Sequence, residues 1–272
     1  MPATPTFIHA PRVYHGANWE GLRTLYLREV KRFWKVGMQT LTAPVVTALL
    51  YMMVFVVAVG GHRIIDIHGM KVPFGTFIAP GLVMMQILGN AFSNSSSSLL
   101  QAKMNGLIGD FLTPPLSPVE QVVGFALGAA TRGIAVGAVA AVAVFPFTHF
   151  QVAHLWAVLF YGLGASLVMG LLGIVAAIWS EKFDHIAAVS NFVIMPMTFL
   201  SGTFYLVDKL PEPFRTASHF NPFFYLIDGF RYGFVGGADG SIAIGAAMTA
   251  GLIVLLTLVC WWMFDTGYKL KP

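Results

Sequence analysis

Charged side chains are scarce in this sequence. Only 10% of the 272 residues are Asp, Glu, Lys or Arg, against about 25% in an ordinary soluble domain. The segment from Gly133 to Ser180 carries none, and other uncharged runs occupy 36–62, 72–102, 185–207 and 240–264. With 57% apolar residues, the chain lacks the polar surface that a soluble protein of this length needs. The scarcity excludes a soluble enzyme and predicts a polytopic membrane protein.

Other absences exclude several kinds of functional site. Cys260 is the sole cysteine, which excludes an intramolecular disulfide. His149 and His154 stand five apart, and neither a His-x-x-x-His nor a Cys pair occurs. Neither a Gly-x-x-x-x-Gly-Lys-Ser/Thr phosphate loop nor a Gly-x-Ser-x-Gly elbow occurs. Basic patches with interleaved aromatics are also missing. We therefore expect no enzyme activity, no cofactor, no metal and no nucleic-acid partner.

The apolar runs are long enough to cross a bilayer, because about 20 residues at 1.5 Å rise span a ~30 Å hydrocarbon core. The expected fold is an all-α integral membrane protein with six transmembrane helices. Residues 1–37 are expected to form a cytoplasmic tail with an interfacial helix, 38–264 the transmembrane domain and 265–272 a cytoplasmic tail. The spans are placed at about 38–60, 76–99, 119–145, 151–179, 186–206 and 241–264.

Lys and Arg are unevenly divided by this topology. Ten of the sixteen fall on the side of the two termini, five fall on the opposite side, and Arg132 lies inside the third span. Cytoplasmic segments carry the excess of Lys and Arg in membrane proteins. We therefore expect both termini in the cytoplasm.

An amphipathic helix is expected at about 18–36, before the first span. At 100° per residue its apolar and basic side chains fall on different faces, which fits a helix lying in the cytoplasmic membrane interface. Glu29 falls inside the apolar arc. Pairing with Arg32 or Arg23 and contact with a protein partner are both open explanations. The apolar face holds Trp19, Leu22, Tyr26, Val30 and Phe33, and the basic face holds Arg28, Lys31 and Lys35.

Two connections between spans look structured. Residues 101–112 can form a short helix, which Pro114 and Pro115 must end. Such a helix is suited to receive a mechanical push from a soluble partner, and a plain loop is the alternative. The last connection, 207–240, is rich in aromatics that a solvated loop would not carry. We expect it to re-enter the outer side of the membrane as one or two short helices, broken at Pro222 and Gly229.

Polar residues inside the spans are candidates for function. An Arg at the bilayer centre costs about 2.5–3.5 kcal/mol on insertion scales, so Arg132 should face the bundle interior or water. It contacts an anionic substrate headgroup, or it snorkels or pairs with Glu120 or another carboxylate; both interpretations stay open. Asn90, Asn94 and the serines up to Ser98 give a polar face at the end of the second span, which lines a passage or caps the helix end.

Small residues and a proline set the expected packing of the spans. Gly124-x-x-x-Gly128 and Gly133-x-x-x-Gly137 predict close helix–helix approach in the third span. Pro196 predicts a kink in the fifth span, either static or a hinge.

Four segments resemble the type-2 (exporter) family of ATP-binding-cassette (ABC) transporter permeases. They read REVKRFWKVGMQTLTAPVVTALLY (28–51), FIAPGLVMM (77–85), LTPPLSPVE (112–120) and FLSGTFYLVDKLPEPFRTASHFNPFFYLIDGFRYGFVG (199–236). The resemblance implies six helices, an interfacial N-terminal helix, and short re-entrant helices before the last span. It implies a bacterial inner-membrane permease that dimerises with a second copy of itself.

The same resemblance implies a partner. Two copies of a separate ATPase subunit bind ATP and drive export of a hydrophobic or amphipathic substrate of the drug, lipid or glycan-lipid class. Residues 103–113 match the coupling helix of the family. The ATPase contacts implied there are Met104, Leu107, Asp110 and Phe111, and those implied on the N-terminal helix are Arg28, Glu29 and Arg32. We expect the translocation path to include Asn90, Asn94 and Arg132.

Two alternatives remain open. An ion-coupled secondary transporter would need inverted repeats or intramembrane carboxylates that bind ions. A polytopic membrane enzyme would need a convergent catalytic cluster. The sequence offers neither at the positions of the expected spans.

Overall fold

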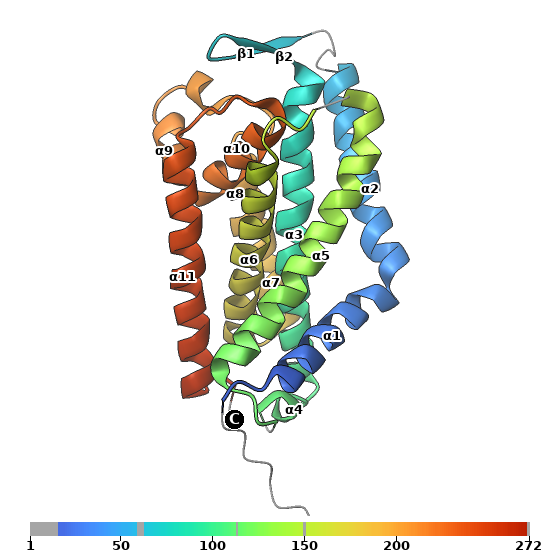
Figure 1. Cartoon of the computed structure of the whole chain (residues 1–272), viewed down its shortest axis with the longest axis vertical. Coiled ribbons are helices and arrows are strands. Elements are labelled where there is room, and N and C mark those ends of the chain that lie inside the picture. The colour runs from blue at the N-terminus through green and yellow to red at the C-terminus, as the bar shows by residue number, and fades with distance from the viewer. Residues whose placement is uncertain (1–15, 59–62, 113, 149–150, 271–272) are drawn as a thin grey trace, which may run out of the picture.

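Long apolar helices run side by side between two ends of the molecule (Figure 1). The structure is a computed structural model that describes residues 16–58, 63–112, 114–148 and 151–270. One end carries a β-hairpin and is called the hairpin end. The other carries the short helix α4 (Gly109–Leu112) and is called the α4 end.

Five helices among the described residues are long and apolar enough to cross a membrane. They agree with five of the six predicted spans. Because apolar length alone defines such a segment, composition was sufficient to find them. These helices are α2 (Gly37–Met53, extended by the π-helical turn η1, Val54–Ala58), α3 (Phe74–Met104), α5 (Pro118–Thr148), α6 (Leu155–Trp179) and α11 (Ile242–Thr266).

The predicted fifth span is shorter than expected and interrupted. Its helix consists of α7 (Phe183–Val189), the π-helical turn η2 (Ser190–Ile194) and α8 (Met195–Phe199). At 1.5 Å per residue this segment is about 25 Å long. It ends before the predicted boundary because the chain turns at Gly202, whose φ of +71° favours glycine. Pro196 lies two residues after the end of the π-helical turn, and both features are known causes of helix kinks.

A β-hairpin is the departure from an all-α fold among the described residues. Strands β1 (Ile64–Ile67) and β2 (Met70–Pro73) pair antiparallel, with Ile65 opposite Val72. His68 and Gly69 form the turn with φ of 49° and 91°, the positive values that a tight two-residue hairpin requires. Alternate strand residues are buried, so the hairpin covers the end of the bundle.

The connection before α11 folds back into the hairpin end, where it forms η3 (Val207–Lys209), α9 (Phe214–Phe220) and α10 (Pro222–Val235). The predicted break at Pro222 is confirmed: Asn221 separates α9 from α10 and accepts a hydrogen bond from the backbone N–H of Phe223. The predicted break at Gly229 is wrong, because α10 continues through it. Gly229 instead allows close packing: a Cβ there would lie 2.3 Å from Cζ of Tyr161.

Arg231 fixes α10 in the bundle. Its guanidinium is 1% exposed, lies 4.1 Å from the ring centroid of Phe77 and donates hydrogen bonds to the backbone carbonyls of Phe77 and Gly202. Asp228 balances its charge at 3.7 Å, and also accepts backbone hydrogen bonds from Asp239 and Gly240. A buried charge needs such partners. Arg231 therefore holds α10, α3 and the turn after α8 together.

The contact between Gly229 and Tyr161 generates a test. Gly229→Ala should lower the free energy of unfolding by about 1–3 kcal/mol, because the ring of Tyr161 is fully buried and its hydroxyl is bonded to the carbonyl of Ile242. Gly251→Ala in α11 is the matched control, since a Cβ there meets no atom within 4 Å. Thermal unfolding in detergent measures both, and equal midpoints for the two variants would contradict the packing described.

Candidate functional site

Helix α1 (Trp19–Lys35) docks on α5 through the first predicted glycine pair. A Cβ at Gly124 would lie 2.6 Å from Leu25, and a Cβ at Gly128 would lie 2.5 Å from Cβ of Glu29. In the second glycine pair, a Cβ at Gly137 would lie 2.3 Å from Ile87 of α3, and a Cβ at Gly133 would lie 2.8 Å from Ser166 Oγ of α6 (Leu155–Trp179). The predicted close packing along α5 is therefore confirmed, with α1, α3 and α6 as the helices that approach these glycines.

Glu29, on α1, is fully buried against α3. Its Oε1 accepts a hydrogen bond from Ser98 Oγ at 2.7 Å, and its Oε2 accepts one from Asn94 Nδ2 at 3.4 Å. The same Oε2 lies 3.4 Å from Nη2 of Arg32. The predicted pairing with Arg32 is confirmed. Because the carboxylate faces the bundle, Glu29 does not present the exposed contact for a partner that the family resemblance implied.

Arg32 joins α1 to the polar face of α3. Its Nη2 donates to the backbone carbonyl of Asn94 at 2.6 Å and to the Asn94 side chain at 3.1 Å, and its Nη1 donates to Ser97 Oγ at 3.1 Å. The side chain remains 28% exposed. Arg32 thus belongs both to the buried cluster and to the surface of the molecule.

Arg132 lies half-buried on α5 with a neutral partner. Its Nη2 donates to Asn90 Oδ1 at 3.2 Å. The expected pairing with Glu120 is wrong, because Glu120 accepts hydrogen bonds from the backbone N–H groups of Asn18 and Ser117 at the start of α5. Within the described chain, Nε of Arg132 is buried and has no acceptor. Asn90 stands one helical turn before Asn94, the residue of α3 to which Arg32 bonds.

The polar residues of α3 divide between two faces. Asn94, Ser95, Ser96 and Ser98 are buried, whereas Gly89, Ser93 and Ser97 form a partly open stripe with Asn90 beside it. A cavity of about 160 Å³ lies on this stripe, where Gly89 and Ser93 meet Ser190 and Asn191 of the π-helical turn. Sequence reasoning grouped these residues into one polar face and could not tell which side each would take.

The predicted short helix at 101–112 is not continuous. Helix α3 ends at Met104, the chain turns at Gly106 with a φ of +71°, and α4 covers only Gly109–Leu112. That φ disfavours any other residue and interrupts the helix. Met104 and Leu107 are 51% and 46% exposed, and Asp110 is also exposed.

Phe111 points inward and is 3% exposed. Its ring lies 4.1 Å below the guanidinium of Arg28, on the exposed side of α1, and 5.3 Å from the ring of Phe125. Phe111 therefore offers no surface to a partner, unlike the contact implied by the family resemblance. It joins α4 to α1 and α5 instead, a contact that no spacing in the sequence indicates.

Two lysines that sequence reasoning did not single out hold the end of α6. Lys103 Nζ donates to the backbone carbonyls of Ile178 and Ser180 at 2.8 and 2.9 Å. Lys269 Nζ donates to the carbonyl of Trp179 at 3.3 Å. Cations at a helix C-terminus satisfy its last carbonyls and complement its dipole. The ends of α3, α6 and α11 are thereby connected.

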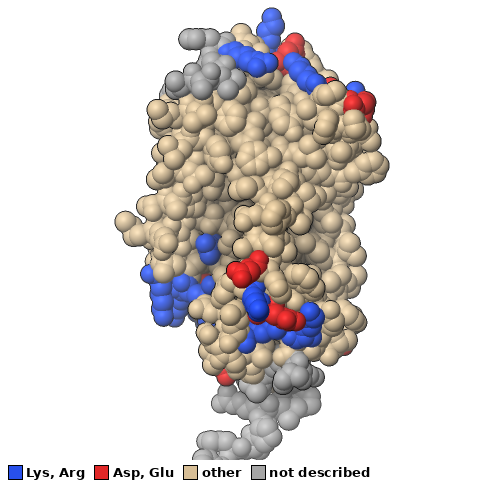
Figure 2. All heavy atoms as spheres, turned by 180° about the vertical axis from the view of Figure 1, so that it is seen from behind, with Lys and Arg blue, Asp and Glu red and all other residues tan. Residues whose placement is uncertain are grey.

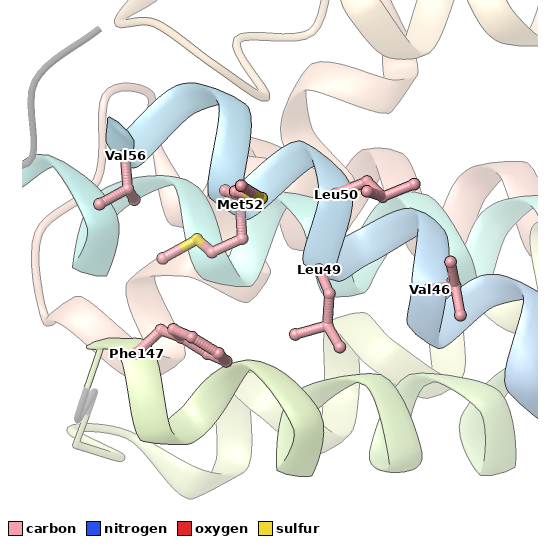
Figure 3. A pocket seen from close by; sticks show the side chains of 7 residues that line it. Val46, Leu49, Leu50, Met52, Val56 and Phe147 are labelled. Atoms are coloured by element: carbon pink, nitrogen blue, oxygen red, sulfur yellow. The ribbon is translucent and has the colours of Figure 1, made fainter. Parts of the chain in front are cut away.

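On the face seen in Figure 2, charge gathers toward the two ends of the molecule. Figure 2 shows Lys, Arg, Asp and Glu gathered there, with a broad uncharged band between them. Within the band, apolar side chains of α2 and α5 surround a pocket of about 340 Å³ (Figure 3). Its lining includes Val46, Leu49, Met52 and Phe147. These apolar side chains suit contact with hydrocarbon and offer no group for polar chemistry. Among the described residues, no three His, Cys, Asp or Glu side chains gather to hold a metal ion.

Comparisons with known proteins agree with this architecture. Residues 20–235 match the sequence model of the family described as ABC-2 type transporter. The inner membrane transport permease YadH of Escherichia coli (strain K12) is 36% identical over 255 residues, which cover 93% of this chain and 98% of that protein. The YadH permease of Shigella flexneri has the same identity and coverage.

A more distant relative is nodulation protein J of Rhizobium leguminosarum bv. viciae. It is 27% identical over 201 residues, which cover 69% of this chain and 73% of that protein. The family match covers most of the chain, and YadH aligns over nearly its whole length. The chain therefore belongs to the ABC-2 type transporter family, as a multi-pass permease of the bacterial inner membrane.

Proposed function

We propose that this permease is the transmembrane subunit of an ATP-driven exporter, in which two copies of the chain work with two copies of a separate ATPase subunit. The observation that carries the proposal is the exposed surface of Met104, Leu107 and Asp110 at the α4 end. Two apolar side chains and a carboxylate in a short loop between two long helices form a compact contact site for a soluble protein. The family match supports an ABC partner for that contact.

The topology of the chain favours six crossings. Helix α1 and the last residues of α11 both lie at the α4 end (Figure 1). An even number of crossings is needed to return the chain to the side from which it started, and the five long helices supply an odd number. The α7–α8 segment is the remaining crossing in this proposal. Its length of about 25 Å is short for a ~30 Å core, which local thinning of the bilayer accommodates.

The α4 end is assigned to the cytoplasm. The basic side chains of α1 gather there, and an excess of Lys and Arg is typical of cytoplasmic segments. On α1, Arg28, Lys31 and Lys35 are exposed, as are Trp19 and Trp34. Exposed aromatics and cations on one helix fit a position in the membrane interface.

Movement of the ATPase would reach the bundle by two routes. The segment that holds Leu107 and Asp110 directly follows α3 in the chain. The stacking of Arg28 on Phe111 connects α4 to α1. Helix α1 is in turn fixed to α3 and α5 through Glu29. In this proposal Met104, Leu107 and Asp110 contact the ATPase directly, Arg28 and Arg32 lie beside that contact, and Glu29 and Phe111 transmit movement from inside.

The translocation path is proposed along the open stripe of α3. Gly89, Ser93 and Ser97, with Asn90 and Arg132 beside them, would face hydrocarbon in a single copy, and polar groups there are unfavourable without partners. A second copy covering this face would enclose a polar passage. Helix α7 and turn η2 have no buried side chain of their own, so they too have surface for such a contact. Asn94 is buried and holds Arg32 instead of lining the path.

An ion-coupled secondary transporter is the alternative, and the buried carboxylates Glu29 and Asp228 are the observation behind it. Both are already matched by arginines, Arg32 and Arg231 respectively. Neither is free to bind a cation in this structure, which favours the ATP-driven exporter. The uncharged band and the apolar α2–α5 pocket favour a hydrophobic or amphipathic substrate.

Co-purification tests the ATPase contact. Asp110→Lys should reduce the amount of ATPase subunit recovered with the tagged permease by about tenfold, since it reverses a charge at the centre of the proposed contact. Asp184→Lys is the matched control, because Asp184 is also exposed at the α4 end but lies on α7. Equal recovery with both variants would contradict the assignment. A wild-type chain that purifies without an ATPase, and transports without ATP, would overturn the proposed function.

The buried cluster of Glu29, Arg32, Asn94 and Ser98 can be tested separately. Glu29→Gln should lower the free energy of unfolding by about 1–3 kcal/mol, because the amide keeps the shape but leaves the guanidinium of Arg32 without its counter-charge. Glu20→Gln, on the exposed side of the same helix, should have no effect. Thermal midpoints of Glu29→Gln, Arg32→Gln and the double variant complete a double-mutant cycle. A coupling energy near zero would show that the pair does not hold α1.

A further inference from the structure

Positive charge is in excess where α1, α3 and α5 meet. Arg32 of α1 and Arg132 of α5 both bond to α3 there, and Glu29 is the carboxylate that pairs with Arg32. Arg132 bonds only to the neutral side chain of Asn90, and no described Asp or Glu oxygen lies within 4.0 Å of it. The cluster thus has two guanidinium groups for one carboxylate.

The two guanidinium groups are attached to one face of α3. Arg132 bonds to Asn90, and Arg32 bonds to Asn94, four residues later. Four residues along an α-helix correspond to a rise of about 6 Å. Each arginine also has a buried Nε without an acceptor in the described part of the chain. A phosphate or carboxylate group placed between them would supply acceptors to both, in the bidentate geometry that guanidinium groups favour.

A basic groove runs along α1 beside this cluster. Its volume is about 620 Å³, and its lining includes Arg28, Lys31, Arg32 and Lys35. Arg32 belongs to both the groove and the cluster. An anionic group attracted to the outer face of α1 would therefore contact Arg32, the member of the cluster that lines the groove.

Apolar surface continues from the cluster along α5. Phe147, which lines the α2–α5 pocket, follows Arg132 by about four helical turns and lies about 60° around the axis from it at 100° per residue. The same side of α5 thus presents a cation at the middle of the helix and a hydrocarbon-lined pocket nearer the hairpin end. That order matches an amphiphile with its headgroup toward the α4 end and its chains in the apolar band.

We propose that Arg32 and Arg132 bind the anionic headgroup of an amphiphilic cargo, a phosphate or carboxylate carried on hydrocarbon chains, which enters along the basic groove of α1. The inference rests on the proposed function as a permease and specifies the charge of what it carries. A basic helix that only touches anionic lipid at the membrane surface would need Arg28, Lys31 and Lys35 but not Arg132, which lies on α5. Substitution of Arg132 therefore distinguishes cargo binding from attachment to the membrane surface.

Lipid binding to the full-length chain in detergent tests the proposal, with native mass spectrometry as the readout. The probes are phosphatidic acid, the zwitterionic phosphatidylcholine, and glycerol 3-phosphate, which has the phosphate without the chains. Phosphatidic acid should bind at least about tenfold more tightly than either of the others. Arg132→Gln should weaken its binding by about tenfold, and Arg132→Lys by less, because the charge remains without the bidentate geometry.

Two further variants complete the test. Arg63→Gln removes an exposed cation at the hairpin end and should leave phosphatidic acid binding unchanged. Asn90→Asp keeps Arg132 but gives it a carboxylate of the same shape, so it should weaken phosphatidic acid binding like Arg132→Gln. It keeps the test valid if Arg132→Gln fails to fold, which thermal unfolding reveals.

Three results would overturn the inference. Unchanged binding in Asn90→Asp and Arg132→Gln, with loss only in a Lys31→Gln, Lys35→Gln variant, would assign the groove to membrane attachment. Glycerol 3-phosphate binding as tightly as phosphatidic acid would indicate a soluble anion. Binding of phosphatidylcholine as tight as that of phosphatidic acid would show that the site does not recognise the charge of the headgroup. Absence of a co-purifying ATPase, by contrast, would refute the proposed function and leave Arg132-dependent lipid binding intact.

Discussion

The close approach of α1 to α5 at Gly128 is the constraint on which the α4 half of the molecule depends. It places the carboxylate of Glu29 out of water against α3, where Asn94, Ser98 and Arg32 must satisfy it. Once Glu29 is there, Arg32 cannot leave without stranding a buried charge. The helix that precedes the first span is therefore an integral part of the bundle.

This arrangement explains why the two faces of α1 differ. The buried face is fixed by a glycine groove and one ion pair, and the outer face keeps its cations free for the membrane, a partner or an anionic group. Between them, Arg28 extends over Phe111 and brings α4 into the same assembly. Contact with a soluble protein at Leu107 and a charged amphiphile at Arg132 would thus act on neighbouring parts of one packed unit.

The sequence alone was sufficient to predict properties that depend on the local order of residues along the chain. Apolar length located five spans, the glycine spacing indicated close packing in α5, and the three-residue interval between Glu29 and Arg32 allowed their pairing to be considered. It was insufficient where chain segments far apart meet. The contact of Arg28 with Phe111 and that of Lys103 with the end of α6 have no local signature.

Local turns were missed for a different reason. The hairpin could have been predicted, because His68-Gly69 stands between alternating apolar residues, but four-residue strands are weak signals beside long apolar runs. The interruption at Gly106 depends on a backbone angle that many glycines in this chain do not adopt. Burial of Phe111 likewise follows from tertiary packing, since an aromatic residue in a short loop is equally compatible with a contact site.

The buried guanidinium of Arg231 has a consequence for biogenesis. Its acceptors are carbonyls of Phe77 in α3 and Gly202 in the turn after α8, and its counter-charge is Asp228 in its own helix. Both acceptor segments leave the ribosome before α10 does, so the receiving site can be complete when the arginine arrives. An order of synthesis with α10 ahead of α3 would expose an unpaired cation to lipid. The linear order of the chain thus suits the insertion of this buried charge.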